Sequence, residues 1–346
     1  MPRVSDLLLQ STIYLYRTED AAEAGDLVGG SGVLIGIESA HSDVRTFPTT
    51  ELWFVTCDHV VQTAPVVRII PRVGDAEYVE HTWTGSLTKD PDVAVAYFRT
   101  VSGVGGESPY SYIPFSRFAS PADFEVLPPN ADGSNPERPY YFGALIGPGD
   151  DTVMVGRFVA DDGILSQTPT LRFGNIASDG PVVVRFEDYR RPSVQECMLV
   201  ESRSLPGYSG SAVYQFHGQS TLGGIEKPVG AEGNVLWRFL GIDCAHMNQK
   251  VDTYGLATSG WVPAMAFPGQ PRESRTNAGM MTVVPAWTIT EALEDAIAKR
   301  EKPDDSGLSL DSLNAPEDNS LTAAGFEEAL RRATRIKPQA GSGPER

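Results

Sequence analysis

Short apolar runs, separated by clusters of glycine, proline, asparagine and aspartate, make up the chain from about Ser11 to Trp287. Their β-branched and aromatic residues and their period-two alternation are typical of half-buried strands. A dozen runs are clear: TIYLYR, GVLIGI, LWFVT, VVRII, VAVAYF, YYFGALI, TVMVGRFV, PVVVRF, ECMLVES, SAVYQF, WRFLGID and GMMTVVPA. The pattern predicts an all-β sandwich or barrel protein, and a dozen strands are more than one small barrel needs.

One helix is predicted near the end of this region, in TITEALEDAIAKR. Thr288 followed by Glu291 has the spacing of a capping box. The apolar positions of one helical face are Ile289, Leu293 and Ile297. Helical periodicity is nearly absent from the preceding chain, and we interpret the N-terminal segment, which has only a three-leucine apolar run, as the first strand.

The composition changes after Arg300, where the chain becomes poor in aromatic residues and rich in proline, aspartate and serine. Such a segment cannot bury enough apolar surface to order itself, so 301–319 is predicted to be a linker. Residues 320–346 are predicted to form a short helical tail, with a weak apolar stripe between about Leu321 and Arg335. This tail is either a solvated amphipathic segment or a segment with an autoinhibitory or partner-docking role, which would involve a regulatory partner.

The charge balance narrows the classes of partner. The chain has 28 Lys and Arg against 45 Asp and Glu, a formal net charge of −17. The resulting field repels phosphate backbones and anionic lipid surfaces, so neither nucleic acid nor a membrane is expected as a partner. No apolar run is long enough for a transmembrane helix, and the N-terminus lacks the apolar segment of a secretory signal.

Three scattered cysteines, Cys57, Cys197 and Cys244, are too few for a disulfide framework or a zinc knuckle. They favour a reducing, cytoplasmic location, although one pair could bridge if the fold brought it together. The most direct interpretation of all three is that they are small buried hydrophobic residues.

The candidate chemistry centres on Ser209 in RSLPGYSGSAVYQF. A hydroxyl is a weak nucleophile at its own pKa and needs a neighbouring base and a third group that orients the base. Among the five histidines, His59 follows the apolar run LWFVTCDHVV, where the chain leaves the sheet. Asp92 directly precedes VAVAYF and can be buried at the start of that strand, whereas Asp90 precedes a proline in the loop. A buried carboxylate that accepts the imidazole N–H holds its tautomer.

The order of these residues along the chain separates fold types. By itself Ser209 in GYSGS is most simply a turn residue, and the settings of His59 and Asp92 favour a nucleophile instead. The order His, Asp, Ser belongs to the chymotrypsin type, whereas α/β-hydrolases and subtilisin-like enzymes use other orders. An all-β chain with this order is consistent with that type.

Four motifs, GGSGVLIG, VTCDHVV, DVAVAYF and LPGYSGSAV, resemble those of the trypsin-like (chymotrypsin-fold) serine proteases. They are nearest in style to the bacterial high-temperature-requirement branch, although no peptide-binding domain of that branch is recognisable in the tail. The resemblance implies a protease domain over 4–300 with two antiparallel six-stranded Greek-key barrels. The N-terminal barrel would span about 4–125, and the C-terminal barrel, with a closing helix, about 138–300.

The same resemblance assigns roles to residues. It implies that His59 is the general base, Asp92 its orienting carboxylate and Ser209 the nucleophile. The backbone N–H groups of Gly207 and Ser209 would form the oxyanion hole. No metal or other cofactor is implied, and the expected partner is a protein or peptide substrate. Tyr208 replaces the acidic residue that trypsins place before the nucleophile, so activation by a freed N-terminus is not expected.

The substrate pocket is less clear from the sequence. By position, Arg203 and Ser204 would lie near its base. The run GIDCAHM would supply a strand that pairs with an extended substrate, and its candidate contact residues are Asp243, Cys244 and His246. Two alternatives remain. Arg203 and Asp243 could make the pocket selective for a charged substrate side chain, or they could neutralise each other.

The sequence therefore predicts a serine endopeptidase that acts through an acyl-enzyme intermediate. Two alternatives use the same residues. One is a catalytically dormant binding or scaffold protein on the protease fold, with a collapsed oxyanion turn. The other is an esterase-like acyl hydrolase, which differs only in its substrate.

Overall fold

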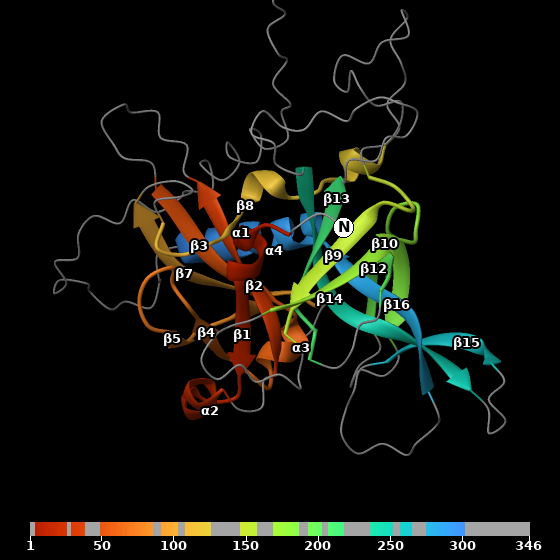
Figure 1. Cartoon of the computed structure of the whole chain (residues 1–346), viewed down its shortest axis with the longest axis horizontal. Helices are drawn as coiled ribbons and strands as arrows, with labels where there is room; N and C mark the ends of the chain where they lie inside the picture. The colour runs from red at the N-terminus through yellow and green to blue at the C-terminus, as the bar shows by residue number, and fades with distance from the viewer. Residues whose placement is uncertain are drawn as a thin grey trace, which may run out of the picture.

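Two antiparallel sheets form the body of the protein (Figure 1). The computed structural model describes residues 4–25, 29–38, 49–85, 91–102, 108–125, 146–157, 169–186, 193–202, 207–217, 236–251, 257–264 and 275–301. The predicted linker, tail and YYFGALI strand lie almost wholly outside these residues. None of the described helices has the length and apolar character required to cross a bilayer.

The first sheet has the strand order β5-β4-β1-β2-β3-β7-β6, and β8 pairs in parallel with β2. Its strands are β1 (Thr12–Tyr16), β2 (Gly30–Glu38), β3 (Thr49–Thr56), β4 (Val66–Ile69), β5 (Glu77–Glu80), β6 (Thr84–Gly85), β7 (Ala94–Ser102) and β8 (Ile113–Pro114). The central strands β1, β2 and β3 are buried almost throughout. Strands that are buried on both faces have continuous apolar sequences, which explains why LWFVT lacks alternation.

The second sheet closes into a ring of six strands, because β10 pairs with both β9 and β12 in the order β10-β9-β13-β14-β16-β12. β11 extends from β12, and β15 pairs with β14. The strands are β9 (Asp151–Gly156), β10 (Thr170–Ile176), β11 (Val182–Phe186), β12 (Ser193–Glu201), β13 (Ala212–His217), β14 (Leu236–Val251), β15 (Ala257–Ala264) and β16 (Arg275–Pro285). The all-β prediction of a chymotrypsin-like double barrel is confirmed.

Helix α4 (Ala286–Glu301) follows β16 and contacts β6 and β7 of the first sheet as well as β14 and β16 of the second (Figure 1). The predicted apolar face is confirmed, since Ile289, Leu293 and Ile297 are buried in a core that includes residues of both sheets. The predicted capping box is wrong. The helix begins at Ala286, so Thr288 lies inside its first turn rather than at its cap.

Several short helices were not predicted from the sequence. They are α1 (Asp6–Gln10), α2 (Glu19–Ala24), α3 (Asp58–Val61), η2 (Phe115–Arg117) and η3 (Pro121–Phe124). The N-terminal segment is therefore a helix before it becomes strand β1, which corrects the interpretation of the whole segment as a strand. The Ser5 hydroxyl accepts the Leu7 N–H at 3.3 Å and caps α1. Helices of one or two turns carry too few residues to show a 3.6-residue period.

Candidate active site

His59 lies in the single turn of α3, directly after β3 ends at Thr56. Residues on both sides of it are buried, and Val60 packs against Gly30 of β2, which fixes the turn against the first sheet. The His59 side chain keeps 20% of its surface exposed. The imidazole is thus held by a rigid strand end and still reaches solvent.

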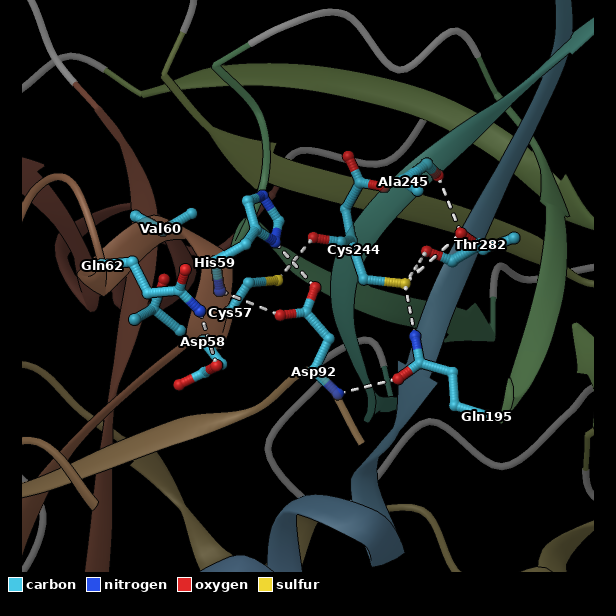
Figure 2. A network of polar contacts seen from close by, with 12 residues as sticks. Cys57, Asp58, His59, Val60, Gln62, Asp92, Gln195, Cys244, Ala245 and Thr282 are labelled. Atoms are coloured by element: carbon cyan, nitrogen blue, oxygen red, sulfur yellow. Dashed lines mark hydrogen bonds and ion pairs between the residues drawn. The ribbon is translucent and has the colours of Figure 1, made fainter. Parts of the chain in front are cut away.

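Asp92 binds His59 through both carboxylate oxygens (Figure 2). The His59 backbone N–H donates to Oδ1 at 3.0 Å, and Nδ1 of the ring lies 2.7 Å from Oδ2. Asp92 precedes β7, which begins at Ala94, and its side chain is 9% exposed. Two hydrogen bonds to one residue leave the ring little freedom to rotate, and the ionised carboxylate selects the tautomer with a proton on Nδ1.

The charges around His59 favour its protonated form. Burial alone lowers the pKa of His59, but the charge and hydrogen bond of Asp92, together with the charges of Asp243 and Asp58, raise it above the usual value of 6.5. A base whose imidazolium is stabilised in this way accepts a proton more readily from an attacking hydroxyl.

Ser209 lies in a tight turn that is tied to both sheets. Its carbonyl accepts the N–H of Ser31 in β2 at 2.9 Å, and the N–H of Gly210 donates to the carbonyl of Asp243 in β14 at 2.7 Å. Gly207 and Gly210 have φ angles of +95° and +83°, which residues with a Cβ rarely adopt. A Cβ on Gly210 would also lie 2.0 Å from the Ser31 carbonyl oxygen, so only glycine fits there.

The turns that carry His59 and Ser209 meet at one carbonyl oxygen. The Cys57 thiol, two residues before His59, donates to the Asp243 carbonyl at 3.3 Å, and the same oxygen accepts the N–H of Gly210, the residue after Ser209. A Cβ on Gly30 would lie 2.7 Å from the Val60 side chain and 3.1 Å from the Ser209 carbonyl oxygen, so both turns approach β2 closely at this glycine. The turns that carry His59 and Ser209 therefore meet at the junction of the two sheets, where Asp92 binds His59.

Tyr208 anchors the turn from the side of the second sheet. Its ring is buried, its hydroxyl lies 2.7 Å from Oγ1 of Thr170 in β10, and the Arg172 guanidinium carbon lies 4.9 Å from its ring centroid. The sequence showed only that an acidic residue is missing at this position. The structure shows a large aromatic side chain that holds the turn by burial and by a hydrogen bond.

The predicted pocket residues lie in different structural settings. Arg203 and Ser204 lie outside the described residues. The side chains of Asp243 and Cys244 are about 1% exposed, and His246 is partly buried, which lowers its pKa. Asp243 and Cys244 are therefore interior residues, which does not fit the predicted role of their side chains as substrate contacts.

The edge of β14 that was expected to pair with an extended substrate is bounded at both ends. β13 pairs with β14 as far as Ile242, and β15 pairs with it from His246 onward. Between them, the N–H and C=O of Asp243 already bond to the Ser209 turn. Only a short stretch of this edge lies between the two strands.

Comparisons with known proteins concern the fold. No protein-family model and no curated protein matches the sequence. A variant of the HtrA-type protease AlgW with a tripeptide aligns with 84% of this chain at 15% identity and a TM-score of 0.38. This chain covers 63% of that protease, which is under two thirds of its length. A variant of Rv3671c from M. tuberculosis, in its inactive form, aligns over 86% of this chain and 91% of its own at 15% identity and a TM-score of 0.40.

A closed six-stranded ring lies beside the other sheet, and one helix contacts both. This arrangement is consistent with a chymotrypsin-like double barrel. In this fold the described His59–Asp92 pair lies at the junction of the two sheets.

Cys57, His59 and Asp92 are also the group of potential metal ligands found among the described residues, with ligand atoms within 4.8 Å of one another. Burial raises the pKa of the Cys57 thiol, which disfavours the thiolate that a metal requires. Nδ1 of His59 is already bonded to Asp92. The arrangement favours proton transfer over metal binding.

The raised pKa of His59 predicts the pH dependence of activity. The base must be neutral to accept a proton, so kcat/KM should increase with pH around a midpoint above 6.5. The same shift stabilises the folded state fully below the pKa of His59 in the unfolded chain, and this contribution is lost as pH rises through the folded-state pKa. A pH–rate profile and NMR titration of the His59 ring would check this, and a midpoint at or below 6.5 would contradict it.

Proposed function

We propose that the protein is a serine endopeptidase that hydrolyses peptide bonds in protein or peptide substrates. The observation that supports this best is the double hydrogen bond from His59 to Asp92 beside the turn of Ser209. A structural histidine needs no ionised carboxylate on Nδ1, whereas a general base needs one to orient its ring and to stabilise the imidazolium.

The chemistry follows from this arrangement. Oγ of Ser209 attacks the scissile carbonyl carbon, and Nε2 of His59 takes the hydroxyl proton. The backbone N–H groups of Gly207 and Ser209 would bind the oxyanion. The protonated His59 then gives its proton to the leaving amine, and an acyl-enzyme forms on Ser209. His59 then takes a proton from water, which attacks the acyl carbon, and His59 returns that proton to Oγ of Ser209 as the C–Oγ bond breaks and the second product is released.

Labelling with a fluorophosphonate tests this proposal. The reagent should form a covalent adduct on Ser209, located by mass spectrometry of the peptide that contains it. Ser211→Ala is the matched control, because Ser211 lies two residues away and its hydroxyl is buried. That variant should label at the wild-type rate. Wild-type protein that remains unlabelled would overturn the proposal and favour the dormant scaffold.

Substrate class is tested separately. Labelled protein should cleave a mixture of unstructured peptides at internal bonds, with new termini identified by mass spectrometry. Turnover of activated esters without any peptide cleavage would favour the acyl hydrolase alternative.

A further inference from the structure

A glutamine of the second sheet holds the main chain of Asp92. The backbone N–H of Asp92 donates to Oε1 of Gln195 at 2.7 Å, across 103 positions of sequence (Figure 2). Asp92 directly precedes β7 of the first sheet, whereas Gln195 lies in β12 of the second. This hydrogen bond therefore crosses the junction at which the candidate active site lies.

The Gln195 amide can take only one orientation here. Its Nε2 donates to Sγ of Cys244 at 3.4 Å, and that sulfur also lies 3.3 Å from the carbonyl oxygen of Thr282. Asp92 offers an N–H, which requires the amide oxygen on its side. The Thr282 hydroxyl donates to the carbonyl of Ala245 at 2.9 Å and so continues the network into β14 (Figure 2).

The polar character of Gln195 is not explained by packing. The start of β12 alternates, with Val194 and Glu196 exposed and Gln195 and Cys197 buried. Gln195 therefore lies on the inner face of the sheet, and it is 5% exposed. Burying an amide there is unfavourable unless its hydrogen bonds are satisfied. An apolar side chain would fill the same space without that requirement.

We propose that Gln195 is a positioning residue for the reaction, a role that rests on the proposed function. It fixes the main chain at Asp92 and thereby keeps both carboxylate oxygens aligned with the two N–H groups of His59. Directly before β7, the Val93 N–H donates to the Pro91 carbonyl in a short turn that includes Asp92. The second sheet thus sets the orientation of a histidine in the first.

Gln195→Met tests the proposal, because methionine has a similar length and replaces the amide oxygen that accepts the Asp92 N–H with a thioether sulfur, which is only a weak acceptor. The matched control is Gln215→Met, since Gln215 is buried in β13 of the same sheet and donates to Asp150 rather than to the triad. Gln195→Met should lower kcat by about 10- to 100-fold through misplacement of the base, with KM changed by less than about 3-fold. Gln215→Met should retain wild-type kcat when folded.

NMR supplies a readout that does not depend on hydrolysis. The downfield resonance of the His59 Nδ1 proton should weaken in Gln195→Met, and the pKa of His59 should fall toward 6.5 because Asp92 no longer faces the ring in a fixed position. If the wild type hydrolyses nothing, the proposed function fails, yet these two signals still decide whether Gln195 positions the pair. A kcat and His59 pKa equal to those of Gln215→Met would overturn the role.

A second variant covers the case in which Gln195→Met does not fold. Gln195→Glu keeps the side-chain length and an oxygen that can accept the Asp92 N–H, and a protonated carboxyl can donate to Cys244. It should retain kcat within about 10-fold of wild type, and the His59 pKa should not fall. A folded Gln195→Glu protein with a lowered His59 pKa would overturn the proposal.

Discussion

Ser209→Ala is expected to lower kcat by about 10⁶-fold while the protein remains folded. The substitution removes the attacking oxygen and leaves the backbone bonds of the turn, including the one from Ser31 to the Ser209 carbonyl. The residual rate would come from substrate binding and the oxyanion N–H groups. Steady-state hydrolysis of an activated ester and of a cleaved peptide measures the loss, and thermal unfolding followed by circular dichroism verifies the fold.

Ser211→Ala again serves as the control, and its kcat should stay within about 3-fold of wild type because its buried hydroxyl has no role in proton transfer. Hydrolysis by Ser209→Ala within about 100-fold of wild type would show that another group attacks the substrate.

Asp92→Asn is expected to lower kcat by about 10⁴-fold. An amide has one acceptor oxygen where the carboxylate has two, so it cannot serve the backbone N–H and Nδ1–H of His59 together. If its NH₂ group faces the ring, the His59 proton moves to Nε2 and the base can no longer accept the serine proton. The bond from Gln195 survives, because it uses the main chain of Asp92.

The pKa of His59 should fall in Asp92→Asn, because the charge that raises it is gone. The pH–rate profile and the NMR titration of the ring measure this shift. Asp58→Asn is the control. Asp58 also raises the His59 pKa but bonds to Gln62 rather than to the ring, so its kcat should change by less than about 10-fold. Equal losses in the two variants would contradict the role of Asp92.

Most of the fold could be predicted from local patterns. The strand runs, the α4 face and the His59 and Asp92 settings at strand ends were all visible in short windows. The short helices were missed because one or two turns show no period. The start of α4 was misplaced because the spacing of Thr288 and Glu291 indicated a capping box. The helix begins earlier, at Ala286, which is buried directly after β16.

The partners of the triad could not be predicted in the same way. Gln195, Ser31 and Tyr208 act through bonds to residues far away in sequence. The sequence offers one indication for Gln195, which is a polar residue at an inward position of an alternating strand. That indication does not identify the residue to which Gln195 bonds. The prediction that the three cysteines are buried is confirmed. Their positions in the sequence do not indicate that Cys57 and Cys244 lie on either side of the Asp92 network (Figure 2).

The sequence by itself determined many of the strands and the apolar face of α4, the order His59, Asp92, Ser209 and the glycines that permit the serine turn. These depend on backbone conformation and side-chain alternation, which act over a few residues. Only the tertiary structure decided that Asp92 meets both N–H groups of His59, that Asp243 joins the two turns, and that Gln195 reaches across the junction. Those contacts depend on how two sheets pack, and hydrogen bonds form only where packing brings a donor and an acceptor within about 3 Å.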